Sequence, residues 1–282
     1  MRNKPGRIEA LTKDIADFNA AGRFSFKQAL HLRGRVLFAR SVCYGRFGAG
    51  ALRALNQAIA EAASARGVLS SHVRLHVRSA LCNLASAVAA APQKCLPIRH
   101  PTPIHVFTDG ACEPAGGILE GTVGAVLIDY AHRRFEYIMA RIDDDMMVKL
   151  GESSQNPICQ VEALGVLAAL FAWELALVDR PVVSWIDNEA TRAALVCGYS
   201  AQRDLAKILE AITTKEVVIQ ASLWFERVPS AANVADAPSR GLPPLALPGL
   251  GAPVQLGMHA ALGSWGLRER VPCTGAPLPP LL

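Results

Sequence analysis

Four acidic residues stand where a carboxylate has no simple structural role. Asp109 ends the β-forming run IHVFTDGA, and Asp187 ends a second such run, VVSWID. Glu162 lies within the apolar segment QVEALGVLAAL, where an ionised side chain is costly to bury and no Lys or Arg is nearby in the sequence. Asp236 lies in NVADAPSRG, at the expected start of a short helix.

Carboxylates gathered in one place repel one another and raise each other's pKa. They stay ionised together only when a hard divalent cation neutralises them, and oxygen ligands alone favour Mg²⁺ or Mn²⁺. Each acid also has a simpler interpretation: a turn at Asp109, a helix N-cap at Asp187 or Asp236, a surface position at Glu162. The metal site is ruled out only if all four simple interpretations are correct at once. Because that would be a fourfold coincidence, the sequence favours a metal site.

The elements that carry these acids follow from the hydrophobic pattern. Three β-rich runs with short turn-like gaps predict an antiparallel meander over residues 104–111, 121–130 and 133–142. A helix that is apolar nearly all round is expected at 156–178, with Asn156 as its N-cap and Pro157 at its first position. Such a helix should be buried against a sheet.

The remaining elements complete an α/β domain. A strand is expected over 181–190, helices over 191–198 and 203–216, and a last strand over 217–229. This order describes a mixed sheet covered by helices. If the first and fourth strands are parallel neighbours, their carboxyl ends bring Asp109 and Asp187 together at one edge of the sheet.

Charge divides the chain into two unlike parts. Residues 1–100 contain 16 Lys and Arg against 4 Asp and Glu, out of 29 and 24 in the whole chain, so the remainder is acidic. From about residue 24 to 91 the pattern is helical, with Ser25 as one expected cap and Ser70 or Ser71 as another. A basic region beside an acidic domain indicates a polyanionic partner, with a merely solvated basic surface as the alternative.

Composition places the domain boundaries. The Pro-rich segment APQKCLPIRHPTP indicates a linker near residue 100. We therefore expect a basic helical region at 1–100, the α/β domain at 101–241 and an irregular Pro- and Gly-rich tail at 242–282.

Other chemistry is disfavoured. Seven cysteines without CxxC or Cys/His spacing argue against a disulfide framework and a zinc site. The longest apolar run, 163–178, contains Glu174 and falls short of the roughly 20 residues that span a bilayer. The N-terminal residues lack the apolar core of a signal peptide. We expect a soluble intracellular protein of the cytoplasm or nucleus, with no membrane partner and no organic cofactor.

Four segments, FTDGA, QVEALGVLAAL, WIDNEATRAAL and NVADAPSRG, resemble in this order the catalytic blocks of ribonuclease H, in the form found in retroelement reverse transcriptases. The resemblance covers roughly residues 103–241. It implies a ribonuclease H-like mixed five-stranded sheet flanked by helices. It also implies that Asp109, Glu162, Asp187 and Asp236 are the catalytic residues and metal ligands.

The resemblance further implies cleavage of the RNA strand of an RNA–DNA hybrid. Asp109 would bridge two Mg²⁺ ions, with Mn²⁺ as an alternative, for water activation and for stabilising the leaving 3′ oxygen. Glu162 and Asp187 would complete the coordination, and Asp236 would hold one ion more loosely. The 2′-hydroxyl would distinguish RNA from DNA.

Candidate contacts to nucleic acid are of two kinds. Backbone amides near the first strand and one side chain near the fourth are expected to position the substrate, while arginines of the helical region supply affinity without sequence preference. These residues are Gly110, Ala111, Cys112, Asn188, Arg33, Arg35, Arg40 and Arg46.

The helical stretch FSFKQALHLRGRVLFARSVCYGRFGAGALRAL resembles the segment that joins polymerase and ribonuclease H in tyrosine-recombinase-type retrotransposons. That resemblance implies a reverse transcriptase fragment, with its polymerase part as a partner. Two departures stand out. No histidine lies between Asp187 and Asp236, and no polymerase palm is present: the run RIDDDMM lacks the tyrosine of a YxDD motif, and its acids, Asp143 to Asp145, are expected in a solvated turn.

Three alternatives remain open. The chain could be a catalytically inactive retroelement relic that binds nucleic acid through its basic region. It could be another nuclease of the same fold, such as a 3′ exonuclease or an integrase-like strand transferase. It could act mainly through residues 1–100 as a helical interaction module.

Overall fold

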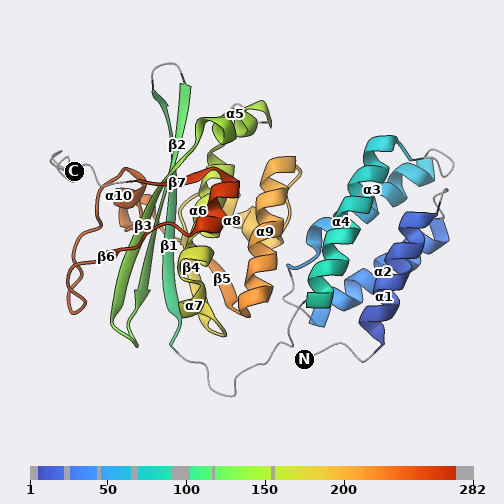
Figure 1. Cartoon of the computed structure of the whole chain (residues 1–282), viewed down its shortest axis with the longest axis horizontal. Helices are drawn as coiled ribbons and strands as arrows, with labels where there is room; N and C mark the ends of the chain where they lie inside the picture. The colour runs from blue at the N-terminus through green and yellow to red at the C-terminus, as the bar shows by residue number, and fades with distance from the viewer. Residues whose placement is uncertain are drawn as a thin grey trace.

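The computed structural model describes residues 6–21, 26–42, 46–64, 69–90, 102–115, 118–153 and 156–270. These residues form a helical bundle and an α/β domain that lie side by side (Figure 1). The expected linker falls almost entirely outside the described residues, as do Ser25 and residues 271–282. None of the helices in the described ranges combines the length and the hydropathy that a membrane crossing needs.

A mixed seven-stranded sheet forms the centre of the α/β domain, in the order β5-β4-β1-β2-β3-β6, with β7 also paired to β3. Its strands are β1 (Ile104–Ala115), β2 (Ile118–Asp129), β3 (Arg134–Ile142), β4 (Pro181–Ile186), β5 (Ser222–Arg227), β6 (Val254–Gln255) and β7 (Leu267–Glu269). Strands β1 to β3 form the expected antiparallel meander. Strand β4 is parallel to β1, and β5 is parallel to β4. The expected fold class is confirmed, with β6 and β7 added at one edge.

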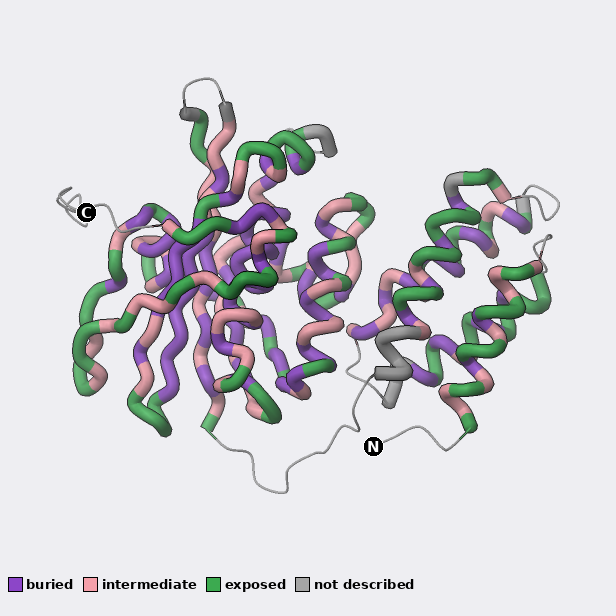
Figure 2. The backbone as a smooth tube through the Cα atoms, in the orientation of Figure 1, coloured by how far each residue is buried: buried purple, intermediate pink, exposed green. Residues whose placement is uncertain are grey.

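Helices cover both faces of this sheet. They are α5 (Asp144–Ser153), α6 (Ile158–Ala172), α7 (Glu174–Leu177), α8 (Glu189–Cys197), α9 (Arg203–Ile219) and α10 (Asp236–Ser239), with the 3-10 helices η1 (Ser230–Ala232) and η2 (Ala260–Trp265). The buried α6 packs on β1 and β2, and it carries the apolar run that predicted a buried helix. The short α10 packs on the opposite face, as the glycine contacts below show. Purple tubes mark this buried centre in Figure 2.

Two predicted boundaries were wrong. The expected helix 156–178 is interrupted at Trp173, whose φ is −110° and whose buried indole donates a hydrogen bond to Glu136 Oε2 of β3 at 3.0 Å. The last strand begins at Ser222 rather than 217, since α9 continues to Ile219 and Gln220 ends it with a φ of 55°.

The acidic run before α5 is also not the solvated turn that we expected. Asp143 accepts a hydrogen bond from the Met146 amide at 3.0 Å, as a helix N-cap does, and Asp144 and Asp145 form the first turn of α5. Carboxylates are favoured there because the helix dipole is positive at its N-terminus. The sequence pattern had predicted no helix between β3 and α6.

The segment after Arg240 differs from the irregular tail that composition suggested. Residues 254–255 (β6) pair with residues 136–137 of β3, and residues 267–269 (β7) pair with residues 140–142 of the same strand. Leu262 and Leu267 are buried in the main core. Residues 242–270 are therefore part of the α/β domain.

The basic region forms a four-helix arrangement with its own core. Its helices are α1 (Arg7–Ala20), α2 (Phe26–Val42), α3 (Ala49–Ser64) and α4 (Ser71–Ala90). Helix α1 was not predicted. Ser70 is the cap of α4, because its Oγ accepts from the Val73 amide at 3.4 Å. Val217 of α9 joins this core, so α9 lies between the sheet and the bundle (Figure 1).

A buried ion pair fastens the bundle to the α/β domain. Arg46 Nη2 lies 2.7 Å from Glu216 Oε1 and 2.8 Å from the Leu223 carbonyl oxygen, and the guanidinium stacks over Phe225. The Glu216 side chain is only 2% exposed. Because Glu216 is buried, removing Arg46 takes away the cation that neutralises its charge.

We therefore expect Arg46→Ala to lower the free energy of unfolding by about 3 kcal/mol. The matched control is Arg35→Ala, since Arg35 pairs with Asp14 at 2.7 Å with both side chains partly exposed. That loss should be about 1 kcal/mol or less. Urea unfolding followed by circular dichroism measures both, and equal losses in the two variants would contradict the assignment.

Candidate active site

Strands β1 and β4 place two of the four acids side by side. The last parallel pair between these strands is Phe107 with Trp185. Asp109 and Asp187 each come two residues later, so both side chains project from the same face as this pair. The strands separate beyond it, and β1 continues to Ala115 paired only with β2. The expected meeting of Asp109 and Asp187 at this edge is confirmed.

Helix α6 brings the third carboxylate, Glu162. A Cβ at Gly110 would lie 2.9 Å from the Glu162 backbone nitrogen and 3.0 Å from Val161 Cγ1. Glycine therefore lets α6 approach β1 closely at this point. One ligand oxygen from each of Asp109, Glu162 and Asp187 lies within 4.8 Å of the others. We call these three residues the carboxylate cluster.

The electrostatics of the cluster indicate a cation. Burial first, then the charges of Asp187 and Asp109, raise the pKa of Glu162 to about 9. Burial likewise raises the pKa of Asp109 to about 6, against the opposing hydrogen bond from Ser239. Within the described part of the chain, Glu162 Oε2 and Asp187 Oδ1 are buried and accept no hydrogen bond. Orphaned carboxylate oxygens that face one another are a donor set suited to Mg²⁺ or Mn²⁺.

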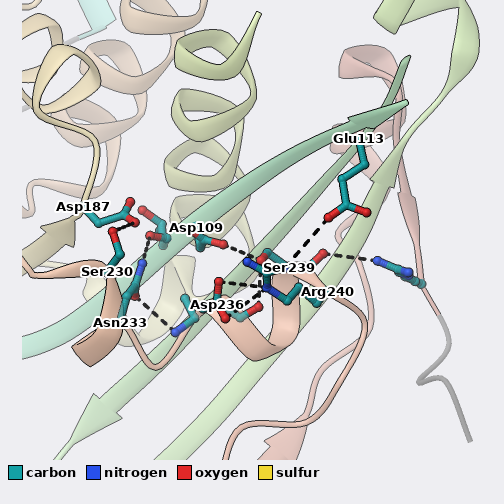
Figure 3. A network of polar contacts seen from close by, with 11 residues as sticks. Asp109, Glu113, Asp187, Ser230, Asn233, Asp236, Ser239 and Arg240 are labelled. Carbon is teal, nitrogen blue, oxygen red and sulfur yellow. Dashed lines mark hydrogen bonds and ion pairs between the residues drawn. The ribbon is translucent and has the colours of Figure 1, made fainter. Parts of the chain in front are cut away.

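Asp236 lies beside this cluster rather than inside it. Its carboxylate is about half exposed and pairs with Arg240 Nε at 3.0 and 3.1 Å. Its charge still contributes to the raised pKa of Asp109. The four predicted acids thus divide into three that share one site and one, Asp236, that lies on its solvent side. Figure 3 shows Asp109, Asp187 and Asp236.

Three polar residues of the site were not singled out from the sequence. Ser239 Oγ donates a hydrogen bond to Asp109 Oδ2, and Ser230 Oγ donates to Asp187 Oδ2 at 2.9 Å. Asn233 Nδ2 donates to the Thr108 carbonyl oxygen at 3.0 Å. All three lie between β5 and the end of α10, and Asn233 and Ser239 belong to NVADAPSRG, but only the fold shows what each one contacts. Ser239 and Ser230 fix the orientation of the Asp109 and Asp187 carboxylates, whereas Asn233 ties this segment to the backbone of β1 (Figure 3).

Gly124 controls how closely α10 approaches the cluster. It faces Asp109 across the β1–β2 ladder, and a Cβ there would lie 2.3 Å from the Ser239 nitrogen and 2.7 Å from the Pro238 carbonyl carbon. Because these are backbone atoms, α10 must move to admit a methyl group. The contacts of Gly110 with α6 and of Gly124 with α10 come from opposite faces of the sheet.

We expect Gly124→Ala to lower the free energy of unfolding by about 1 to 3 kcal/mol and to displace Ser239 from Asp109. Gly165→Ala is the control, since its Cβ would meet Asp109 O only at 3.4 Å and alanine favours the α6 helix. Thermal unfolding of both variants measures the change. If Gly124→Ala unfolds at the temperature of the parent, α10 leaves room for a methyl group and the prediction is wrong.

The candidate nucleic-acid contacts have varied surroundings. Arg33 Nε donates to Asn56 Oδ1 at 2.7 Å, and Arg35 pairs with Asp14, both on the surface of the bundle. Arg46 is held in the buried ion pair with Glu216. Arg40 lies in α2, but its side chain is outside the described residues. The bundle therefore keeps two of these four arginines at its surface and uses one to join the domains.

Asn188 has a structural task. Its side chain accepts from the Thr191 amide at 3.1 Å and caps α8, directly after Asp187. Gly110, Ala111 and Cys112 lie in β1 where β4 has separated from it. In an antiparallel ladder alternate amides point away from the partner strand. This segment therefore turns some amides toward the space beside Asp187.

No protein-family model matches this chain, and the search of curated proteins found no significant match. Similar solved structures include LC11-RNase H1 isolated from compost, with 19% identity, a TM-score of 0.36, and coverage of 48% of this chain and 91% of that one. RNase H1 from Halobacterium salinarum has 21% identity and a TM-score of 0.34, and the match covers 49% of this chain and 94% of that one. The N-terminal RNase H domain of a Mycobacterium tuberculosis protein has 18% identity and a TM-score of 0.36, and the match covers 50% of this chain and 92% of that one. TM-scores this low carry no weight for function, which must be inferred from the carboxylate cluster.

Proposed function

We propose that this chain is a metal-dependent endonuclease of the ribonuclease H type, which cleaves the RNA strand of RNA–DNA hybrids. The observation that carries the proposal is the convergence of Asp109, Glu162 and Asp187, with two buried oxygens that lack partners. Three acids gathered without a compensating cation would destabilise the fold. The resemblance of the four sequence segments supports the choice of substrate.

The proposed ligands of the metal are Asp109, Glu162 and Asp187, with Asp236 as a looser ligand on the solvent side. Bound divalent ions, two Mg²⁺ with Mn²⁺ as an alternative, would supply water activation and stabilisation of the leaving oxygen. Ser239 and Ser230 each bond one carboxylate oxygen, which leaves the second oxygens of Asp109 and Asp187 available to a metal. Arg240 holds Asp236 in place.

Substrate contacts follow from the same geometry. We propose that amides of Gly110, Ala111 and Cys112 and the backbone beside Asn188 meet the phosphates near the cleaved bond. We also propose that Arg33, Arg35 and Arg40 of the bundle contact the hybrid further along. Arg46 is left out of this set because its guanidinium is held by Glu216.

The wider setting is a separate part of the proposal. The resemblance of residues 24–55 supports an origin in a retroelement reverse transcriptase, whose polymerase part would be the partner. We propose that a protein which acts on the RNA–DNA hybrids of such an element works in the cytoplasm or nucleus. Pull-down of a polymerase domain from the same element would test this part independently of cleavage.

The deciding experiment compares labelled RNA–DNA hybrid, duplex RNA and duplex DNA of one sequence, in Mg²⁺, Mn²⁺ or EDTA. Cleavage restricted to the RNA of the hybrid, and lost in EDTA, is the expected result. Binding of all three duplexes without cleavage in either metal would favour the inactive relic. The full chain should be used, because deleting the bundle would remove Arg46, the ion-pair partner of Glu216, and would uncover Val217 of α9, which is buried in the bundle core.

A further inference from the structure

An aromatic row lies on the sheet beside the carboxylate cluster. In β4 and β5 the residues alternate between buried positions and half-buried or exposed ones, so one face of these two strands is uncovered. Over β2 and β3 the same face is covered by Val234, Ala235, Leu247 and Leu250, and Phe107 of β1 lies half-buried at the edge of that cover. The uncovered part carries Trp185 of β4 and Trp224 of β5, and Trp224 is 65% exposed. Trp224 lies opposite Val183 of β4, which in turn lies opposite His105 of β1, so these side chains share one face without Trp224 being part of the stack.

The rings of the row are held in place. Phe107 and Trp185 stack with centroids 5.7 Å apart and planes at 12°, and His105 stacks on Trp185 at 6.1 Å and 21°. Trp185 Nε1 donates to His105 Nδ1 at 3.1 Å, and Trp224 Nε1 donates to Glu226 Oε2 at 3.2 Å. Rings fixed in this way lose little conformational freedom when a ligand stacks on them.

The row is continuous with the carboxylate cluster. Phe107 and Trp185 come two residues before Asp109 and Asp187 on the same strands, and the side chains of each pair share one face. Two residues of a strand span about 7 Å, which is about two stacked nucleotides. A nucleic-acid strand that leaves the cluster toward the start of β1 and β4 would therefore cross these rings.

The chemistry of the row selects unpaired bases. Every base has a π-face, so aromatic rings bind single strands with little sequence preference, whereas paired bases in a duplex do not offer their faces. The charged group that orients Trp224 is a glutamate, Glu226, and not a cation. Contacts here would thus be made to bases rather than to phosphates.

We propose that the aromatic row of His105, Phe107, Trp185 and Trp224 binds unpaired bases of the strand next to the cleavage site. The preferred substrate is then a hybrid joined to a single-stranded stretch rather than a blunt hybrid. This inference rests on the proposed function, because it takes the carboxylate cluster as the place of cleavage.

The test measures binding of the full chain in EDTA, where no cleavage occurs. The probes are a blunt RNA–DNA hybrid and the same hybrid with a single-stranded extension at either end. We expect an extension at one end to tighten binding and quench tryptophan fluorescence. Trp224→Ala should weaken binding of that probe about tenfold, leave the blunt hybrid unchanged, and be rescued by Trp224→Phe. Leu245→Ala is the control, because Leu245 is a similarly exposed apolar residue of the segment after α10.

Two outcomes would overturn the inference. Equal affinity for blunt and extended probes would show that no unpaired base is bound. A Trp224→Ala effect that Trp224→Phe does not rescue would show that the ring is not the contact. Cleavage of the blunt hybrid in Mg²⁺ is assayed separately, so a failed carboxylate site is recognised by lost cleavage and a failed aromatic row by lost discrimination between probes.

Discussion

Asp109→Asn is expected to lower the rate of hybrid cleavage by at least about a thousandfold. Asp109 supplies one of the three carboxylates of the cluster, and the hydrogen bond from Ser239 holds its side chain in place. Asparagine keeps the shape of the side chain but loses one negatively charged oxygen. Single-turnover cleavage of labelled hybrid in Mg²⁺ measures the change.

Two further variants show whether that loss belongs to the site. Asp236→Asn should cost less, about 10- to 100-fold, because Asp236 is outside the group of three and half exposed. Asp145→Asn should leave the rate unchanged, since Asp145 lies exposed in the first turn of α5. A parent-like rate in Asp109→Asn would remove the carboxylate cluster from the mechanism.

The second large effect is a dependence of stability on pH and metal. Without metal, burial and the charges of Asp187 and Asp109 raise the pKa of Glu162 from 4.5 to about 9. Between these values the folded protein keeps a proton that the unfolded chain has released. The free energy of unfolding should therefore be greatest below pH 4.5, as far as this group is concerned, and should fall as pH rises toward 9.

Divalent metal should oppose this fall. Metal binds the ionised carboxylates of the folded state, so Mg²⁺ should raise the unfolding temperature most at alkaline pH, where no proton has to be displaced. Thermal unfolding from pH 5 to 9, in EDTA and in Mg²⁺, measures the effect. Coincident curves at every pH would show that no metal binds at these carboxylates.

Glu162→Gln assigns the dependence to one residue. Glutamine has the shape of the protonated glutamate and cannot ionise, so this variant should lose both the alkaline fall in EDTA and most of the gain from Mg²⁺. The fall due to Asp109 should remain at lower pH, because burial raises its pKa only to about 6. A full alkaline fall in Glu162→Gln would place the titrating group elsewhere.

The pattern of apolar and polar residues predicted much of the site, because strands and helices each have their own period in the sequence. Period-2 runs that end in Asp109 and Asp187 predicted two strand ends, of which the first was wrong because β1 continues to Ala115. The apolar surroundings of Glu162 predicted a buried acid in a helix. Parallel pairing of β1 with β4 then made the meeting of the two aspartates a matter of register. Glu162 joins them because α6 packs closely on β1 at Gly110.

Only the tertiary structure decided the contacts between distant segments. Ser239 reaches Asp109 across 130 residues, and Arg46 reaches Glu216 across 170. Nothing near Arg46 in the sequence distinguishes it from the surface arginines, because its burial depends on where α9 packs. Likewise Trp173 finds its hydrogen-bond partner in Glu136 of β3, and residues 254–255 and 267–269 become strands only because they pair with the edge of β3. The sequence by itself thus determined the acids and the strands and helices that carry them. The residues that contact these acids were decided by the tertiary structure, since hydrogen bonds and packing between distant segments leave no local pattern in the sequence.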